Sequence, residues 1–327
     1  MKFKVSELFY SAQGEGRYVG VPSIFLRMFG CNFTCSGFGC KPGEKSTEAD
    51  EVAKNVHLYK TFEELPLVNT GCDSYASWHP DFKHLSPTYT AQELADKMAE
   101  LLPNGHWLQP NGNPVHLVIT GGEPLLGWQR AYPELLDILA ERGLRHITFE
   151  TNGTQELQRS FKEYLHNWFG EITFSVSPKL TVSGEKYEDA IKPDIIWDLE
   201  TYGVTYLKFV VEKIEDFDEL DRAVDEYRLR GFAGPVFVMP VGGVVREIGG
   251  TNRAIRDMHG CLGDAIHVDQ LRPRVAVTFK PRAQAREFQR LTAKNHITQR
   301  QRLRIGDPFL GLHELAEGRG QIGRAHV

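Results

Sequence analysis

The sequence predicts an α/β protein built on a parallel β-sheet, and three observations lead to this class. Six short apolar runs are spaced along the chain, and helical patterns lie between them. The composition, with 41% hydrophobic and 25% charged residues, is that of a globular protein. Each run is almost continuously apolar, as is typical of strands covered on both faces. Strands that alternate with helices form either an open doubly wound sheet or a partial barrel.

The expected strands and helices follow each other in a regular order. The strands are SIFLRMF (23–29), VHLVIT (115–120), HITFE (146–150), ITFSV (172–176), YLKFVV (206–211) and VFVMP (236–240). One helix is expected to begin at Thr90, which forms a capping box with Glu93. Two further helical patterns end at Gly143 and Gly231, and glycine is the residue type that most often closes a helix.

Charge and hydropathy exclude several classes of function. The net charge of -5 gives no general attraction to nucleic acid, whose binding proteins usually carry a basic stripe. The first residues, MKFKVSELFYSAQGEG, lack the apolar core of a signal peptide, and no window reaches the roughly 18 apolar residues of a membrane span. We therefore expect a cytoplasmic protein that binds neither nucleic acid nor membrane. In a reducing compartment, clustered cysteines bind metal or serve catalysis more often than they form disulfides.

Four of the five cysteines lie in one stretch, at Cys31, Cys35, Cys40 and Cys72. Four thiolates could close around a zinc ion that only stabilises the fold. Three thiolates could instead hold a four-iron cluster, which leaves one iron open to another ligand. The cysteines by themselves leave both alternatives open.

Polar or glycine-rich segments follow most of the expected strands. The cysteine loop follows the first strand, TGGEP (120–124) the second, ETNGT (150–154) the third, SVSPK (175–179) the fourth and MPVGG (239–243) the sixth. In both candidate architectures the carboxyl ends of the strands meet at one edge, where the chemistry takes place. The pattern therefore predicts one site built from several loops, which favours an iron–sulfur cluster over structural zinc.

These segments, in this order, resemble the 7-carboxy-7-deazaguanine synthases, a family of radical S-adenosylmethionine enzymes. The resemblance rests on ELFYSAQGEGRYVGVPSIFLRMFGCNFTC, GCDSYASW, ITGGEPLL, FETNGT, SVSPK, LKFVV and VMPVG, and runs from about residue 4 to about residue 245. It implies a partial (β/α)6 TIM-like barrel with a [4Fe-4S] cluster, S-adenosylmethionine and Mg2+. The implied reaction converts 6-carboxy-5,6,7,8-tetrahydropterin to 7-carboxy-7-deazaguanine and releases ammonia, on the route to 7-deazapurines such as queuosine. The implied partners are the pterin substrate, an electron donor such as flavodoxin or ferredoxin, and a second copy in a homodimer.

The resemblance implies that Cys31, Cys35 and Cys72 hold the cluster, although the spacing departs from that of the family. The third family cysteine follows the second after two residues and precedes Asp and then Thr or Ser. Cys40 follows Cys35 after four residues, two residues too late, whereas Cys72 stands before Asp73 and Ser74 with 36 residues between it and Cys35. A set that uses Cys40 instead of Cys72 is the alternative. The inserted residues 41–70 are polar and charged, which is typical of a surface loop.

The family also implies the remaining site residues. Ser74 takes the place of the hydroxyl that helps to bind Mg2+, with turn capping as the structural alternative. S-adenosylmethionine is assigned to Gly121, Gly122, Glu123, Glu150, Asn152, Ser175, Ser177 and Lys179. The pterin is assigned to Gln13, Glu15, Gly16 and Arg27, of which Arg27 suits the substrate carboxylate because a guanidinium pairs with it through two hydrogen bonds. A structural ion pair is the alternative for Arg27.

We divide the chain into a radical S-adenosylmethionine core, residues 1–245, and a C-terminal region, residues 246–327. The cluster loop with its insertion spans about residues 30–89 of the core. The C-terminal region contains an isolated Cys261 and matches no family motif, and its last residues, QIGRAHV, resemble translated sequencing-adapter sequence. Two other functions stay open: a radical S-adenosylmethionine enzyme for another substrate, and a zinc-stabilised binding protein without redox chemistry.

Overall fold

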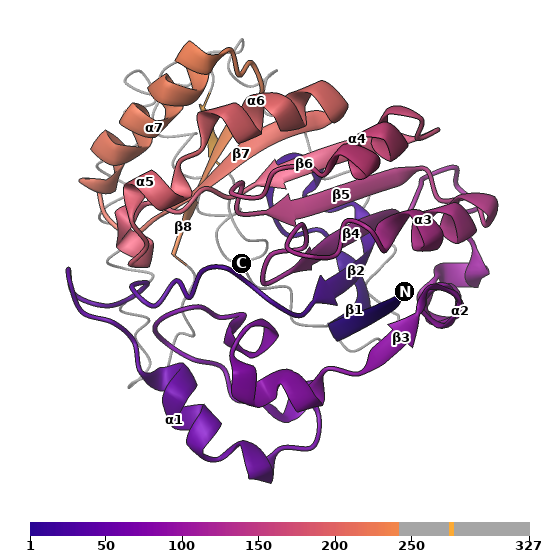
Figure 1. The fold of residues 1–327 in the computed structure, drawn as a ribbon, viewed down its shortest axis with the longest axis horizontal. Helices are drawn as coiled ribbons and strands as arrows, with labels where there is room; N and C mark the ends of the chain where they lie inside the picture. Colours follow the sequence, from indigo (N-terminus) through magenta and orange to yellow (C-terminus); the bar gives the residue numbers. More distant parts are fainter. Residues whose placement is uncertain (242–274, 278–327) are drawn as a thin grey trace, which may run out of the picture.

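The structure, a computed structural model, describes residues 1–241 and 275–277 (Figure 1). Within these residues, nine strands form one sheet in the order β3-β1-β2-β4-β5-β6-β7-β8-β9. The strands are β1 (Lys2–Ala12), β2 (Pro22–Met28), β3 (Thr88–Thr90), β4 (His116–Gly121), β5 (His146–Thr151), β6 (Glu171–Val176), β7 (Val204–Val211), β8 (Val236–Pro240) and β9 (Val275–Val277).

The six predicted strands are confirmed as β2 and β4 to β8, all paired in parallel. From β4 onward the strands lie side by side in chain order, so every crossover steps in the same direction. A doubly wound sheet would contain a point where this direction reverses. The described sheet contains none, and its winding is that of a partial β/α barrel.

Three strands were not predicted from the sequence. β1 runs antiparallel to both β2 and β3, and β9 extends the parallel sheet beyond β8. β3 and β9 have three residues each, too few for a readable alternation of apolar and polar side chains. The predicted boundary at residue 245 and Cys261 lie outside the described residues.

The helices of the described part lie in the segments that connect the strands (Figure 1). They are α1 (Glu48–Lys54), α2 (Ala91–Leu101), α3 (Tyr132–Glu141), α4 (Arg159–His166), α5 (Tyr187–Ala190), α6 (Pro193–Tyr202) and α7 (Asp216–Arg230). The capping box at the start of α2 is present, because Thr90 Oγ1 accepts from Glu93 N and Glu93 Oε2 accepts from Thr90 N. Gly231 ends α7 in the left-handed region, with φ of 112°, as the sequence predicts.

The two faces of the sheet differ in character. Leu26, Ile119 and Phe149 belong to the large apolar cluster that also contains residues of α2, α3, α4, α6 and α7. Their chain neighbours Arg27, Thr120 and Glu150 instead line a cavity on the other face. Because successive side chains of a strand point to opposite faces, each strand supplies both the core and the site.

The segment inserted in the cysteine loop is more ordered than expected. Instead of a polar surface loop, it contains α1 and short 3-10 turns at Val56–Leu58 and Phe62–Glu64, and two more such turns follow it at Tyr75–Ser77 and Pro80–Leu85. One apolar cluster joins Ala53, Leu65 and Val68 of the insertion to Tyr75, Ala76, Phe82 and Leu85, which follow it. These residues follow neither a helical nor a strand period, which is why the pattern alone did not reveal a core.

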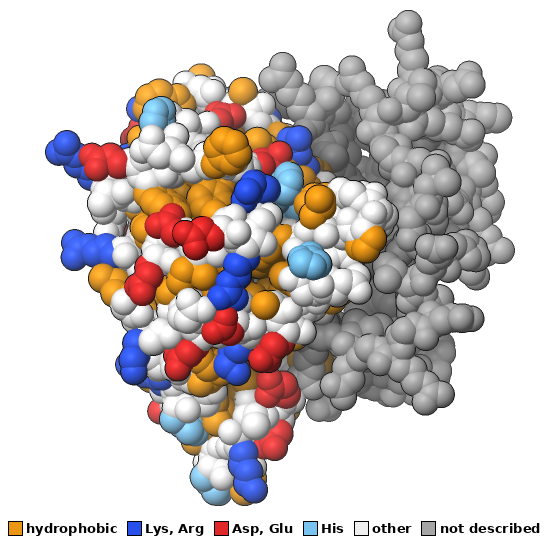
Figure 2. Space-filling view, turned by 90° about the vertical axis from the view of Figure 1, so that its right-hand side faces the viewer, with side chains coloured by type: hydrophobic (Ala, Val, Ile, Leu, Met, Phe, Trp, Pro, Cys, Tyr) orange, Lys and Arg blue, Asp and Glu red, His pale blue; other side chains and the backbone are white. Residues whose placement is uncertain are grey.

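The surface of the described part mixes both signs of charge. On the face shown in Figure 2, acidic and basic side chains are interspersed among apolar ones. Among the described helices, none has the length and apolar character that crossing a bilayer requires.

Candidate active site

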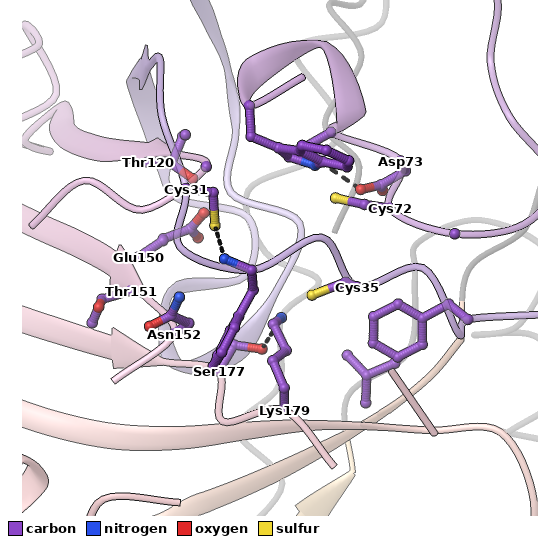
Figure 3. Close-up of a pocket in the computed structure, with 18 of the residues that line it drawn as sticks. Cys31, Cys35, Cys72, Asp73, Thr120, Glu150, Thr151, Asn152, Ser177 and Lys179 are labelled. Atoms are coloured by element: carbon purple, nitrogen blue, oxygen red, sulfur yellow. Dashed lines mark hydrogen bonds between the residues drawn. The ribbon is translucent and has the colours of Figure 1, made fainter. Parts of the chain in front are cut away.

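A cavity lies at the carboxyl ends of the parallel strands (Figure 3). The strands contribute Arg27 from β2, Thr120 and Gly121 from β4, Glu150 and Thr151 from β5, and Lys208 and Val210 from β7. The cysteine loop and its insertion contribute Cys31, Phe33, Cys35, Phe38, Val68, Asn69, Gly71, Cys72, Asp73, Ser74 and Trp78. The predicted meeting of several loops at one edge of the sheet is therefore what the structure shows.

Three of the four described cysteines surround this cavity. Cys31, Cys35 and Cys72 line it, and Figure 3 shows their sulfur atoms facing a common space. Cys40 is not among the lining residues, and its thiol donates to the carbonyl oxygen of Ser36 at 3.7 Å. All four are free thiols. After the insertion, the chain thus lines the cavity again at Cys72.

The chemistry of the three thiols suits a group that binds thiolates. Burial raises the pKa of Cys31 to about 12 and that of Cys72 to about 11, and burial also raises the pKa of Cys35 well above its ordinary value. The side chains are therefore protonated on their own, and a metal centre that binds them releases protons. Within the described residues, no three His, Cys, Asp or Glu side chains are grouped to hold a single metal ion.

A carboxylate that the sequence analysis missed holds the backbone around Cys35. Glu185 Oε1 accepts from the backbone N–H of Cys35 at 2.7 Å and from that of Thr34 at 2.9 Å. Cys35 has a φ of 47°, a left-handed conformation that is costly for a residue with a side chain. Glu185 lies 150 positions away, on the segment after β6, so no local pattern could have indicated this contact.

A close approach between two glycines fixes the same loop. Gly37 N donates to the carbonyl oxygen of Ser183 at 2.8 Å. A Cβ atom on Gly37 would lie 2.5 Å from the backbone nitrogen of Gly184. Only a residue without a side chain fits between these two backbones.

Gly121 and Gly122 allow β4 to approach the start of the cysteine loop. A Cβ atom on Gly121 would lie 2.3 Å from the carbonyl oxygen of Met28, and one on Gly122 would lie 2.3 Å from that of Gly30. Both glycines line the cavity. Their backbone groups are therefore accessible to a ligand, while side chains at these positions would separate the two segments.

The structure gives Glu123 a different position from the one expected for a cofactor ligand. Its side chain is fully buried and is not among the lining residues. One oxygen accepts from Thr151 Oγ1 at 2.7 Å and from Leu125 N at 3.0 Å, and the other accepts from Asn152 N at 2.7 Å. Glu123 therefore braces the loop after β5 from behind the cavity. Burial raises its pKa to about 7, although these donors act in the opposite direction.

Of the other residues assigned to S-adenosylmethionine, most reach the cavity. Glu150, Asn152, Ser177 and Lys179 line it, and Lys179 Nζ donates to Ser177 Oγ at 3.2 Å. Ser175 is the exception, because it is buried one level deeper, opposite Tyr206 of β7. Its assignment as a residue in contact with the cofactor does not agree with this position.

The residues assigned to the pterin occupy two levels. Arg27 lines the cavity directly, whereas Gln13, Glu15 and Gly16 lie behind its wall. Gln13 Nε2 donates to Glu150 Oε1 at 3.0 Å. Gly16, with φ of 66°, packs against the ring of Tyr206, where a Cβ atom would lie 2.7 Å from the ring.

Arg27 and Lys208 are the buried cations of this part of the cavity. Arg27 Nε pairs with Glu7 Oε2 at 2.8 Å, and Arg27 Nη1 donates to Ser74 Oγ at 2.8 Å. The ion pair that was the structural alternative for Arg27 is thus present, and the same side chain also reaches Ser74. Lys208, which was not among the predicted residues, pairs with Glu15 Oε2 at 2.7 Å.

Fold and site together define the class of the protein. A singly wound β/α sheet with a cysteine loop and a glycine-lined cavity at its carboxyl edge is the arrangement of a radical S-adenosylmethionine enzyme. No protein-family profile matches the chain.

Comparison with known proteins gives the family. The chain is 32% identical over 240 residues to the 7-carboxy-7-deazaguanine synthase of Halobacterium salinarum, which is 68% of this chain and 70% of that protein. It is 28% identical over 260 residues to the synthase of the same name from Pyrobaculum aerophilum, covering 78% and 87%. The crystal structure of QueE from Escherichia coli is similar with a TM-score of 0.45 and 20% identity, over 85% of this chain and 94% of that one. The chain belongs to the 7-carboxy-7-deazaguanine synthase family.

Proposed function

We propose that the protein converts 6-carboxy-5,6,7,8-tetrahydropterin to 7-carboxy-7-deazaguanine with release of ammonia, using a [4Fe-4S] cluster and S-adenosylmethionine. The observation that carries this proposal is the shared cavity: Cys31, Cys35 and Cys72 line the same space as Arg27 and Lys208. A cluster site and a site for an anionic substrate therefore adjoin each other. The family membership supports the same reaction.

In this proposal Cys31, Cys35 and Cys72 hold the cluster, and Cys40 does not. Three thiolates leave one iron open, which is the position that the cofactor needs. Cys40 is turned toward the carbonyl oxygen of Ser36, and the cavity is lined without it. Glu185 holds the backbone at Cys35, a ligand that both candidate sets share.

When bound, the cluster and S-adenosylmethionine supply the one-electron chemistry that begins with hydrogen abstraction from the substrate. The chain itself binds, orients and shields the reactants. Gly121 and Gly122 present backbone groups to the cofactor, and Lys179 with Ser177 supplies a positive charge and a hydroxyl for its carboxylate. Arg27 faces the substrate carboxylate, and Glu123 keeps Asn152 in place through its backbone N–H.

Magnesium is a further part of the proposal. Ser74 and Asp73 line the cavity, and Ser74 Oγ donates to Asp73 Oδ1 at 3.3 Å. Mg2+ prefers oxygen ligands and retains several waters, so these two residues together with substrate oxygens suit it. Arg27 lies against the same hydroxyl and would share the substrate carboxylate with the ion.

From the family alone, we propose a flavodoxin or ferredoxin as the electron donor and a homodimer as the assembly. We also propose the cytoplasm as the location, as the sequence predicts.

The test compares two cysteine variants in oxygen-free protein. After reconstitution, the wild type and Cys40→Ala should each retain about four irons per chain with absorption near 400 nm, whereas Cys72→Ala should lose the cluster. The wild type should also release ammonia and the deazaguanine product from the carboxypterin. Loss of the cluster in Cys40→Ala but not in Cys72→Ala would reverse the ligand assignment. A purified chain with one zinc ion and no iron would refute the proposed enzymatic function.

A further inference from the structure

Lys208 is a buried cation that lines the cavity, and the sequence analysis assigned it no role. It lies on β7, its residue is 4% exposed, and it lines the cavity together with Glu150 of β5. Its Nζ atom lies 2.7 Å from Glu15 Oε2 and 3.9 Å from Glu150 Oε1. Two carboxylates within about 4 Å of a buried ammonium stabilise its charged form. Burial alone would lower the pKa of Lys208, but Glu15 and Glu150 outweigh it and raise that pKa.

The lysine belongs to a closed ring of four polar side chains. Gln13 Nε2 donates to Glu150 Oε1 at 3.0 Å, and Gln13 Oε1 accepts from the backbone N–H of Glu15 at 3.2 Å. Glu15 in turn pairs with Lys208. Three segments distant in the sequence, those at residues 13–15, β5 and β7, are tied together in this way.

The ring has two levels relative to the cavity. Lys208 and Glu150 line the cavity, while Gln13 and Glu15 lie behind them. Each residue at the back holds one at the front: Gln13 holds Glu150, and Glu15 holds Lys208. The cavity therefore presents a hydrogen-bond acceptor and a charged donor side by side, both already oriented.

This pair complements a specific chemical edge. A 2-amino-4-oxo pyrimidine ring carries N–H donors next to a carbonyl oxygen, so it offers one donor face and one acceptor to neighbouring groups. A carboxylate accepts from such N–H groups, and an ammonium donates to the carbonyl oxygen. A ring that carries an amino group in place of the carbonyl would instead place N–H groups against the ammonium.

We propose that Lys208 is a substrate-binding residue that donates to the ring carbonyl of the pterin and selects for it, with Glu15 as the residue that positions the lysine. This inference rests on the proposed function, because it names the group that reads one edge of the proposed substrate. It also gives Glu15 a supporting position instead of a direct one. Arg27, paired with Glu7 and Ser74, remains for the carboxylate at the other end of the substrate.

The test measures the binding of two ligands that do not turn over. They are 6-carboxypterin and 2,4-diamino-6-carboxypteridine, which differ at the ring carbonyl. Binding is measured by ligand fluorescence to the reconstituted enzyme. The wild type should prefer the carbonyl compound by at least about tenfold, since a site built around a hydrogen bond rejects the analogue that lacks the partner. Lys208→Met should bind 6-carboxypterin about 10- to 100-fold more weakly, and its preference should fall below about threefold.

Several variants separate binding from folding. Lys213→Met removes an exposed lysine that follows the same strand and should bind both ligands as the wild type does. Glu15→Gln keeps the lysine but weakens its anchor, so it should show a smaller loss of preference even if Lys208→Met does not fold. Lys208→Arg retains the charge and should preserve part of the preference.

The outcomes distinguish this inference from the proposed function. An equal loss of affinity for both ligands in Lys208→Met and Glu15→Gln would mean a merely structural lysine, and unchanged affinities would mean that the lysine does not contact the ring. Either result overturns the inference while the wild type still converts the carboxypterin. A wild type that neither binds the pterin nor converts it would instead overturn the proposed function.

Discussion

Removal of the Glu185 carboxylate is expected to destabilise the cysteine loop in a graded way. Glu185 Oε1 receives two backbone N–H groups, those of Thr34 and Cys35, together with a longer contact from Thr34 Oγ1 at 3.4 Å. Glu185→Gln retains a neutral oxygen at this position, whereas Glu185→Ala removes the acceptor. Comparison of the two variants separates the contribution of the charge from that of the hydrogen bonds.

The magnitudes follow from the two backbone bonds. Hydrogen bonds to a charged acceptor contribute about 1 kcal/mol more each than neutral ones, so glutamine should cost about 1–2 kcal/mol. Alanine loses both bonds, but water reaches the half-buried site, so the cost should be about 2–4 kcal/mol. At about 2–4 °C per kcal/mol for a domain of this size, the melting temperature should fall by about 2–8 °C and about 4–16 °C.

Thermal unfolding of the metal-free protein measures these shifts without any contribution from the cluster. Glu188→Gln changes an exposed carboxylate on the neighbouring helix α5 and should leave the melting temperature within about 1 °C of the wild type. In reconstituted protein, the alanine variant should also lose iron faster to a chelator, because Cys35 is no longer held in its left-handed conformation. A Glu185→Ala protein as stable and as retentive of iron as the control would refute this account of the loop.

Two further predictions concern pH and act in opposite directions. Burial raises the pKa of Glu123 from 4.5 to about 7, so the folded state binds the carboxyl proton more tightly than the unfolded state does. The stability that this proton contributes is therefore lost as pH rises from 4.5 to 7, by up to about 3 kcal/mol. Glu123→Gln should remove that decline, as chemical denaturation of metal-free protein at several pH values would show. Burial and the neighbouring His146 lower the pKa of His116 from 6.5 to about 4, so its contribution is present above pH 6.5 and is lost as pH falls toward 4, again by up to about 3 kcal/mol. His116→Gln should therefore be less sensitive to acid than the wild type, and equal slopes in both proteins would contradict the assignment.

Much of the sheet could be predicted because its signals are local. The apolar runs at β2 and at β4 to β8 are short, continuous and separated by helical patterns, so each strand can be predicted from a few neighbouring residues. The same applies to the capping box at Thr90 and to the terminal glycine at 231. β1 and the edge strand β3 depend on antiparallel pairing with partners elsewhere in the chain, and no local pattern specifies such a partner.

The sequence predicted which loops form the site, but it predicted fewer of the individual side-chain contacts. Gly121, Gly122 and Lys179 line the cavity, as expected from their places at or after the ends of strands, and Arg27 lines it from within β2. Glu123 stands in an equivalent motif but faces away from the cavity, because side-chain direction near the end of a strand depends on the local backbone. Ser175 lies on the same face of the sheet as Glu150 but is buried and does not line the cavity. Glu185 lies in no recognised motif, and Lys208 lies in LKFVV, a segment to which the sequence analysis assigned no site role. Both were identified only through contacts over long sequence separations.

The sequence by itself determined the alternation of strands and helices, the edge at which the loops gather and the chemical types of side chain available there. Only the tertiary structure showed that Cys72 lines the cavity while Cys40 does not, and that the insertion packs with the residues after it around one apolar cluster. It also decided which carboxylates support the site from behind and which face the cavity. The physical reason is that periodicity and capping act over a few residues, whereas burial and pairing of charges depend on segments that only folding brings together.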